Sequence, residues 1–312
     1  MRFVFMGTPI FAVPALASLL NIEDSSIVGV YTPPDRPAGR GRKSQASPVK
    51  EFAEENRLPV YQPNNFRKEE DQAELAGLKP DAIIVAAYGK LLPKPVLDLP
   101  SFGCLNIHPS LLPRHRGPSP VATSILNGDL VTGVTIMLLD EGMDTGPLIA
   151  QHEFFLKGDE TAEGLTTALF ELGGELLKES LPQWQSGKLL SEAQNESLAS
   201  VSRKFERADG LVDWSSSAVE LERRLRAFNP WPGLFTHWND SSLKIIEVAI
   251  ISSSSKEFAP GTVVGTNHPD VPAAVATGDG FLGLTKIQLE GKKAVDVKDF
   301  LNGSPLFMGA QL

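Results

Sequence analysis

The sequence has little cysteine and lacks the long apolar segments of exported and membrane proteins. Its 312 residues include one cysteine, Cys104, which excludes an internal disulfide and is typical of a reducing cytosol. The longest purely apolar run, Ala82–Ala87, is far shorter than the roughly 20 residues that cross a bilayer. The first residues lead directly into Gly7–Pro9 and leave no room for the apolar region of a signal peptide. We therefore expect a soluble, cytoplasmic protein with no membrane partner.

Several common cofactor motifs are also absent. The first predicted strand is not followed by Gly-x-Gly-x-x-Gly, which argues against a nucleotide cofactor of the dinucleotide type. The sequence contains no Walker lysine loop and no Gly-x-Ser-x-Gly elbow, so nucleotide hydrolysis and serine-hydrolase chemistry are disfavoured. Cys104 and His108 lack a second pair of cysteine or histidine ligands, and we expect no metal site.

Positive charge is scarce in the chain but locally concentrated. Lysine and arginine total 29 against 38 aspartate and glutamate, and the net charge of −9 argues against a broad nucleic-acid-binding surface. Residues 35–50 are the exception, because five basic side chains there oppose one acidic side chain: Arg36, Arg40, Arg42, Lys43 and Lys50 against Asp35. A basic island in an acidic protein directs a polyanion to one place.

Chain length and apolar patterns predict two domains. In the first half, short apolar strands alternate with helices, which is typical of an α/β fold with right-handed crossovers and a parallel-rich sheet. We expect strands at Arg2–Met6, Ile27–Thr32, Asp81–Ala86, Cys104–Ile107, Gly133–Leu139 and Leu148–Phe155, and helices at 11–20, 47–56 and Glu160–Leu181.

The last third of the chain has a different pattern. Gln183–Arg203 is polar and is broken by Gly187, so it is predicted to be a linker. From Arg207 onward, one helix and several short strands separated by turn residues predict a small barrel or sandwich. These elements are expected at Ala218–Phe228 for the helix and at Leu243–Ile251, Gly261–Val264, Ala273–Thr277 and Leu282–Leu289 for the strands. We therefore expect a domain at 1–185, a linker at 186–206 and a domain at 207–312.

Asn106 and His108 end a predicted buried strand, where open α/β sheets place their reactive groups. The two residues are two positions apart, so their side chains share one face of an extended backbone. An amide that stabilises an oxyanion beside an imidazole that exchanges a proton suits acyl transfer. The alternative is a strand-end turn with a hydrogen-bonded core histidine.

Two carboxylates in Asp140–Pro147 are candidates for pairing with this histidine. A carboxylate from this turn could fix the tautomer of His108 and raise its basicity. We favour Asp144 over Asp140 because Asp144 lies in the tighter Asp-Thr-Gly turn. The alternative is a solvated turn without a chemical role.

Six segments, in order along nearly the whole chain, resemble the methionyl-tRNA formyltransferases. They are Met6–Ala12, Pro34–Lys43, Asn106–Pro113, Gly133–Met137, Asp144–Gly146 and Phe228–Pro232. The resemblance implies a Rossmann-like formyltransferase domain and an OB-like C-terminal β-barrel domain that binds tRNA. It also implies transfer of the formyl group of 10-formyltetrahydrofolate to the α-amino group of initiator methionyl-tRNA, without a metal or redox cofactor.

The same resemblance implies the site residues. The catalytic set is Asn106, His108 and Asp144, and the folate pocket comprises Ala86, Tyr88, Gly89, Leu91, Leu92, Ser110, Leu111, Leu112 and Pro113. In this scheme Asn106 and a protonated His108 hold the oxyanion, Asp144 keeps the imidazole charged, and the imidazolium protonates the leaving folate nitrogen. The enzyme is expected to act as a monomer.

The basic loop is the expected tRNA-binding element, through Arg36, Arg40, Arg42 and Lys43. Asn302–Leu312 has no basic residue, although the family tail is often basic. C-terminal contacts with RNA would then depend on four lysines: Lys286, Lys292, Lys293 and Lys298. The alternative is that these lysines only provide surface charge that keeps the protein soluble.

Two other functions remain open at this point. A formyltransferase that acts on a nucleotide sugar or a ribonucleotide would share Asn106, His108 and Asp144 but would have no use for the basic loop. A non-catalytic RNA-binding protein would use the loop but would not need the three polar residues.

Overall fold

The computed structural model describes residues 1–38, 43–251, 253 and 255–312. The chain forms two compact units, and each is described here by itself. The first unit contains residues 1–120, 131–155 and 165–203, and the second contains residues 121–130, 156–164 and 204–312. In the described residues no helix is both long enough and apolar enough to cross a membrane.

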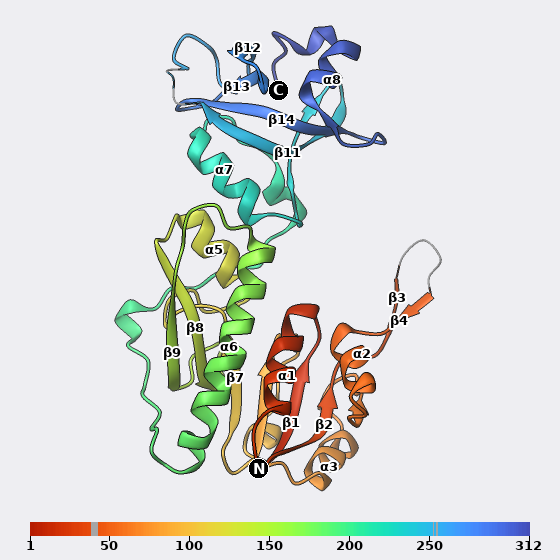
Figure 1. Ribbon diagram of the computed structural model, residues 1–312, viewed down its shortest axis with the longest axis vertical. Coiled ribbons are helices and arrows are strands. Elements are labelled where there is room, and N and C mark those ends of the chain that lie inside the picture. Colours follow the sequence, from red (N-terminus) through yellow and green to blue (C-terminus); the bar gives the residue numbers. More distant parts are fainter. Residues whose placement is uncertain (39–42, 252, 254) are drawn as a thin grey trace. The chain divides into compact units, whose positions relative to one another are not determined.

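A seven-stranded sheet forms the centre of the first unit (Figure 1). Its order is β5-β2-β1-β6-β7-β8-β9, with β1 at Arg2–Gly7, β2 at Ser26–Tyr31, β5 at Val60–Tyr61, β6 at Ala82–Ala86, β7 at Cys104–His108, β8 at Val131–Leu138 and β9 at Leu148–Phe155. The strands are parallel except β8, which runs antiparallel to both neighbours. Strands β2 and β5 lie on one side of β1, and the later strands β6 to β9 lie on its other side. The strand order therefore reverses between β1 and β6, which flank a topological switch point.

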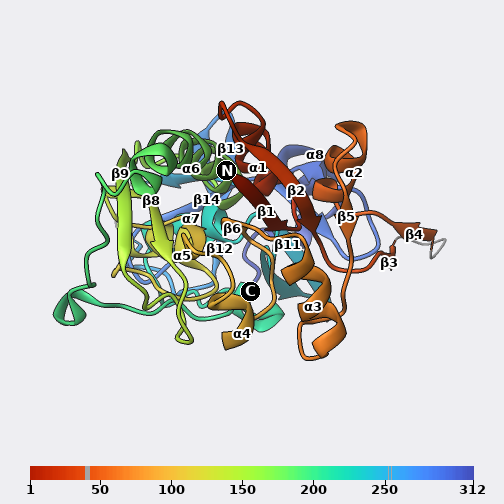
Figure 2. The same cartoon turned by 90° about the horizontal axis from the view of Figure 1, so that it is seen from below.

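Both faces of this sheet are covered, which explains why β1 and β6 are continuous apolar runs. Phe3 and Phe5 pack in the cluster that includes helices α1, α2 and α6, whereas Val4 and Met6 pack in the cluster that includes α3 and α4. Figure 2 shows these two groups of helices on opposite sides of the sheet. The helices are α1 at Val13–Leu20, α2 at Pro48–Glu55, α3 at Glu69–Gly77, α4 at Lys94–Leu97 and α6 at Ala162–Gln185.

Most expected elements of the first unit are present with boundaries shifted by a few residues. Helix α2 begins after Ser47, whose side chain accepts a hydrogen bond from the Lys50 N–H at 3.1 Å, as an N-cap should. Helix α3 was not expected, because it buries only Leu75 and therefore carries no apolar periodicity. Strand β5 and helix α4, with two and four residues, were missed because they are too short for a pattern.

The basic segment contains a two-stranded hairpin, β3 at Arg36–Ala38 and β4 at Lys43–Gln45. A polar cluster lies at its base. The Lys50 ammonium donates to the Asp35 carboxylate at 2.7 Å, and Gln62 donates to the same carboxylate at 2.7 Å. These hydrogen bonds hold the pKa of Asp35 below its ordinary value, and they tie the residue before β3 to α2 and to the residue after β5.

The second unit contains a six-stranded antiparallel sheet around its own core. Its strands are β10 at Leu234–Trp238, β11 at Ser241–Ile251, β12 at Val263–His268, β13 at Val271–Ala276, β14 at Phe281–Leu289 and β15 at Val295–Asp296, with helices α7 at Ala218–Ala227 and α8 at Val297–Gly303; α5, at Pro120–Asn127, belongs to this unit from Val121 onward. The expected strand at Gly261–Val264 starts instead at Val263, because Gly261 turns the chain at φ +93°.

The predicted linker, residues 186–206, contains one short 3-10 helix, Glu196–Leu198, and a second one, Arg207–Gly210, begins directly after it. Residues up to Arg203 nevertheless cluster with the first unit. The reason is a series of hydrogen bonds to the loops after β7 and β8, which a sequence pattern does not reveal.

Gly173 on α6 permits the close approach of this helix to β7. A Cβ atom at position 173 would lie 2.5 Å from Ile107 Cγ2 and 3.0 Å from Val134 Cγ2. We expect Gly173→Ala to lower the free energy of unfolding by roughly 1–2 kcal/mol, because overpacking outweighs the gain in helix propensity. Denaturant titration measures this difference. Gly77→Ala in α3 is the matched control, since no atom lies within 4 Å of its Cβ position; equal effects at both positions would contradict the packing argument.

Candidate active site

The carboxyl ends of β1, β6 and β7 meet at one edge of the sheet of the first unit. Thr8 follows β1, and its hydroxyl donates to the Tyr88 carbonyl after β6 at 3.0 Å. Asn106 and His108 lie on β7, the next strand along. This edge adjoins the topological switch point, where open α/β sheets bind their ligands.

His108 is almost fully buried, with 4% of its surface exposed, and both ring nitrogens face polar groups. Its Nε2 lies 3.1 Å from the carbonyl oxygen of His115. Because a carbonyl oxygen only accepts, this contact requires a proton on Nε2. The other nitrogen, Nδ1, lies 3.6 Å from Asp144 Oδ2. The neutral imidazole therefore presents its basic nitrogen towards the carboxylate.

Asp144, and not Asp140, is the carboxylate near the imidazole. Asp144 has a left-handed backbone with φ +55°, and its Oδ2 also accepts a hydrogen bond from the Gly117 N–H at 2.8 Å. Asp140 instead closes its own turn, where it accepts from the Gly142 N–H at 3.0 Å and the Thr145 hydroxyl at 2.8 Å. The structure thus brings together the histidine and the aspartate that the sequence singled out.

The protonation state of His108 differs from the one expected. Burial lowers the pKa of His108, and it outweighs the opposing effects of the Asp144 carboxylate and the His115 carbonyl. The direction of this shift favours the neutral ring, whereas the resemblance implies an imidazole that Asp144 keeps charged. The carboxylate limits the depression of the pKa, while desolvation decides its direction.

Asn106 is half-buried and lies two residues before His108 on the same strand. Its backbone pairs with Val85 on β6 and Met137 on β8, so its position is fixed from both sides. Within the part of the chain that the structure describes, its side-chain amide has no hydrogen-bond partner in the protein. This leaves the amide able to donate to a ligand.

The residues implied for the folate pocket are Ala86, the last residue of β6, and residues of the two loops that follow β6 and β7. Ala86, Tyr88, Ser110 and Leu112 are buried, Leu92, Leu111 and Pro113 are half-buried, and Gly89 and Leu91 are exposed. The Ser110 hydroxyl donates to the Arg114 carbonyl at 2.6 Å and so closes its own loop. The Thr135 hydroxyl donates to the Ser110 carbonyl at 2.6 Å and holds that loop against β8.

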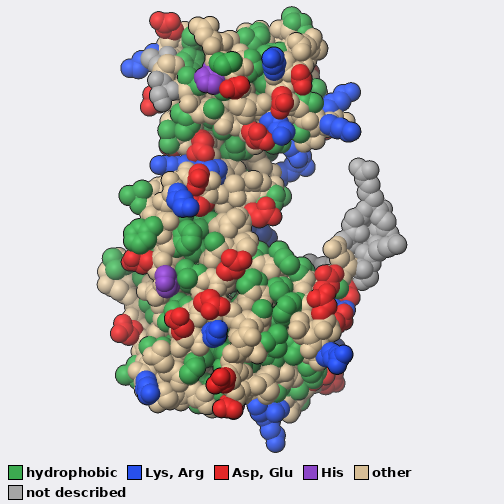
Figure 3. Space-filling view, viewed as in Figure 1, with side chains coloured by type: hydrophobic (Ala, Val, Ile, Leu, Met, Phe, Trp, Pro, Cys, Tyr) green, Lys and Arg blue, Asp and Glu red, His purple; other side chains and the backbone are tan. Residues whose placement is uncertain are grey.

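The residues implied for tRNA binding are only partly described. Arg36 and Lys43 lie on the two strands of the β3–β4 hairpin, whereas Arg40 and Arg42 lie outside the described residues. In the second unit, Lys286 donates to Glu247 at 3.1 Å, so this lysine already has an acidic partner. Figure 3 shows Asp and Glu side chains interspersed with Lys and Arg on the visible face.

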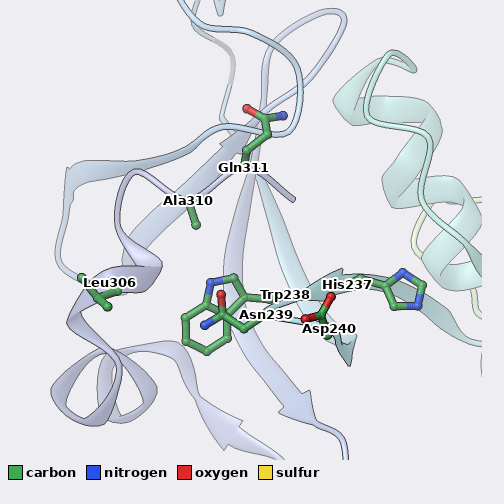
Figure 4. A pocket seen from close by; sticks show the side chains of 7 residues that line it. All are labelled: His237, Trp238, Asn239, Asp240, Leu306, Ala310 and Gln311. Atoms are coloured by element: carbon green, nitrogen blue, oxygen red, sulfur yellow. The ribbon is translucent and has the colours of Figure 1, made fainter.

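A surface hollow of about 510 Å³ lies in the second unit (Figure 4). Residues of the β10–β11 turn and of the C-terminal segment line it: His237, Trp238, Asn239, Asp240, Leu306, Ala310 and Gln311. Trp238 packs edge-on against Phe307, with ring centroids 5.3 Å apart, so one wall of the hollow is the rim of the core. None of the lining residues belongs to the catalytic or folate set.

Sequence reasoning missed three groups that contact the His108–Asp144 pair. They are the His115 carbonyl, the Gly117 N–H and the Gln194 side chain. The only sequence signal for Gly117 is that it is a glycine in the segment after the strand of His108, and the structure gives the reason for it: its φ is +98°, and a Cβ there would lie 2.8 Å from the Ser202 carbonyl oxygen. Gln194 had none, because it lies in a polar segment that is typical of a linker.

Cys104 is buried on β7, and its thiol donates to the Val96 carbonyl with a sulfur–oxygen distance of 3.6 Å. Burial raises the pKa of this thiol to about 12, so it stays protonated at neutral pH.

Comparisons with known proteins define the class first. Residues 1–181 match the formyl transferase family model, and residues 204–305 match the formyl transferase C-terminal domain. The sugar 3N-formyl transferase WlaRD has a similar fold, with a TM-score of 0.64 and 21% identity over 94% of this chain and 99% of that one. The fold and the site therefore define a formyl-transferring enzyme.

Closer relatives define the family. A methionyl-tRNA formyltransferase from Marinobacter nauticus is 48% identical over 303 residues, which is 97% of this chain and 96% of that one. One from a Roseiflexus species is 45% identical over 312 residues, which is 100% of this chain and 95% of that one. The chain belongs to the methionyl-tRNA formyltransferase family. The resemblance seen in the sequence and the expected fold class are confirmed.

The geometry predicts how His108 titrates. Because Asp144 raises the pKa of His108 against the effect of burial, Asp144→Asn should lower that pKa further. Asp140→Asn should leave it almost unchanged, since Asp140 is bonded within its own turn. On acidification, His108 in the Asp144 variant should then stay neutral to a lower pH than in the wild type. NMR titration of the labelled imidazole measures this; a larger shift in the Asp140 variant would reverse the assignment.

Proposed function

We propose that this protein transfers the formyl group of 10-formyltetrahydrofolate to the α-amino group of initiator methionyl-tRNA. The observation that carries the proposal is the His108–Asp144 pair beside Asn106, at the ligand-binding edge of the sheet in a methionyl-tRNA formyltransferase chain. The use of folate is supported by WlaRD, which was solved in the presence of 5-N-formyl-THF. Because a tRNA substrate is used in translation, we propose that the enzyme acts in the cytoplasm. We also propose that it acts as a monomer.

Asn106, His108 and Asp144 are the proposed catalytic residues. The free amine of the aminoacyl ester attacks the formyl carbon, a carbon–nitrogen bond forms, and the carbonyl oxygen becomes an oxyanion. The Asn106 amide donates a hydrogen bond to that oxyanion. His108, neutral before the attack, accepts the proton that the amine loses.

Collapse of the intermediate breaks the bond between the formyl carbon and the folate nitrogen, which must regain a proton. The imidazolium of His108 is the proposed donor of that proton, and the net charge of the site is then restored. A proton held on Nδ1 faces Asp144 Oδ2, which stabilises the charged ring only while it is needed. Burial favours release of the proton, so His108 can serve first as base and then as acid.

The folate site is proposed at the loops after β6 and β7. It comprises Ala86, Tyr88, Gly89, Leu91, Leu92, Ser110, Leu111, Leu112 and Pro113. The two loops follow adjacent parallel strands, which supports a single pocket between them. We further propose a catalytic domain at 1–185, a linker at 186–206 and a tRNA-binding domain at 207–312, with Arg36, Arg40, Arg42 and Lys43 as contacts to the tRNA from the first of these.

An activity assay tests the proposed function directly. The purified protein, supplied with 10-formyltetrahydrofolate, should formylate charged initiator methionyl-tRNA much faster than elongator methionyl-tRNA. A nucleotide aminosugar should not be formylated at a comparable rate. Equal rates on the two tRNAs would contradict initiator specificity, and preference for the aminosugar would favour the alternative formyltransferase.

Substitution of the catalytic residues should separate chemistry from folding. His108→Ala and Asn106→Ala should each lower single-turnover formylation about 10²–10³-fold, since each removes a group needed in the transition state. Asp144→Asn should also lower turnover strongly, and Asp140→Asn should lower it much less. Thermal unfolding serves as the control for stability. Near-normal turnover in the Asn106 or His108 variant would exclude the proposed role of that residue.

Substitutions in the basic loop should weaken the binding of tRNA and leave the binding of folate unchanged. Arg42→Leu should weaken binding of methionyl-tRNA, and Arg40→Leu should do so less, while folate binding stays unchanged. Each lost phosphate contact should reduce the log–log slope of tRNA affinity against salt by about 1. Titrations at several salt concentrations measure the slope. Superimposable salt curves for Arg42→Leu and the wild type would mean that this arginine does not contact RNA.

A further inference from the structure

A strap, defined as residues 192–202, is attached to the loop that follows His108 and to the chain next to the Asp144 loop; it is irregular apart from the 3-10 helix Glu196–Leu198. At one end, Glu192 and Leu148 exchange two backbone hydrogen bonds of 2.8 Å each at the start of β9. At the other end, the Ser200 carbonyl accepts from the Arg116 N–H at 2.9 Å. The strap is thus attached to the loop after β7 and to the strand that follows the Asp144 loop, and all of these residues belong to the first unit.

Gln194 lies between these two attachments, and its side chain is buried with 9% exposed. Its Nε2 donates to the carbonyl oxygens of Asp144 at 2.9 Å and Gly146 at 2.7 Å. Its Oε1 accepts from Nε and Nη2 of Arg116 at 3.0 and 2.8 Å. A primary amide has two donor hydrogens and two acceptor positions, so the hydrogen-bonding capacity of Gln194 is fully used.

These contacts lie on both sides of the His108–Asp144 pair. Arg116 follows His115, whose carbonyl accepts from His108 Nε2, and precedes Gly117, whose N–H donates to Asp144 Oδ2. On the other side, the Gln194 amide donates to the backbone carbonyl of Asp144 and to that of Gly146 in the same loop. The distance of 3.6 Å between His108 Nδ1 and Asp144 Oδ2 therefore depends on two loops that are joined by the Gln194 amide and by the hydrogen bond from the Gly117 N–H to Asp144 Oδ2.

We propose that Gln194 is a positioning residue for formyl transfer: it holds the Asp144 loop against the loop after β7 and thereby sets the spacing of the His108–Asp144 pair. The inference rests on the proposed catalytic roles of those two residues. Gln194 itself touches neither His108 nor the Asp144 carboxylate, so it acts through the backbone and not on the substrate.

The neighbouring contacts allow the role of Gln194 to be separated from the stability of the strap. Arg116 also donates to both carboxylate oxygens of Glu196, at 3.0 and 2.7 Å, and these bonds persist without Gln194. The carbonyls of Asp144 and Gly146 would lose the hydrogen bonds that Gln194 donates. The strap should then remain attached while the carboxylate moves, and a displacement of about 1 Å near reacting groups can cost about 100-fold in rate.

Two substitutions test the proposal in the full-length protein. Gln194→Met keeps the length of the side chain and removes all four hydrogen bonds. Gln194→Glu keeps the acceptor for Arg116 but turns a carboxylate oxygen towards the two carbonyls. We expect each to lower kcat for formylation of methionyl-tRNA about 10–100-fold, with KM for both substrates changed less than about threefold. Gln72→Leu is the matched control, because Gln72 lies on α3, away from the site, and its amide donates to the Phe66 carbonyl.

A double-mutant cycle with Asp144→Asn distinguishes positioning from a general loss of structure. If Gln194 acts through Asp144, Gln194→Met should cost less than about threefold in kcat in the Asp144→Asn background. The acid limb of the pH–kcat profile should also move in Gln194→Met and stay in place in Gln72→Leu. A purely structural role predicts multiplicative losses and an unchanged profile.

The possible failures are distinct. If Asp144→Asn lowers turnover while both Gln194 variants retain wild-type kcat, the positioning role is excluded and the proposed function stands. The same holds if the Gln194 and Asp144 losses multiply. If Asp144→Asn keeps wild-type turnover, the proposed role of Asp144 fails, and the positioning role fails with it.

Discussion

A buried imidazole that must keep both ring nitrogens in polar contact is the constraint on which the site depends. An unpaired polar group in the interior is costly, so the Nε2 proton of His108 needs an acceptor, and a second proton on Nδ1 is stabilised by a nearby carboxylate when the ring is charged. The His115 carbonyl supplies the first, with a left-handed backbone of φ +59° at that residue, and Asp144 supplies the second at φ +55°. Both unusual conformations follow from this requirement.

The same burial explains how one histidine can take part in two proton transfers. Desolvation lowers the pKa of His108, while the Asp144 carboxylate raises it. In the proposed mechanism the neutral ring accepts a proton when the amine attacks, and the Asp144 carboxylate stabilises the charged ring until that proton leaves. Desolvation alone would favour the neutral imidazole, and the Asp144 carboxylate alone would favour the charged imidazolium.

Local patterns identified much of the fold and the main polar residues of the site. The alternation of apolar strands and helices predicted the sheet of the first unit, and the Asp-Thr-Gly turn favoured the carboxylate that lies near His108. The charge state of His108 could not be predicted, because desolvation depends on packing from both faces of the sheet. Gln194 could not be identified either, since it bonds the carbonyl of Asp144 across 50 positions in the chain.

The hairpin β3–β4 satisfies a different constraint from the buried pair. If the proposed contacts to tRNA are made by this hairpin, an acidic protein concentrates on one element the positive charge that attracts a polyanion. The Lys50–Asp35–Gln62 cluster pairs the one acidic side chain of this segment with Lys50 and Gln62 at the base of that element. The buried pair and the hairpin thus share no side chain. Formyltransferases with other amine substrates could keep the first and alter the second, because a change in the hairpin leaves the contacts of His108 intact.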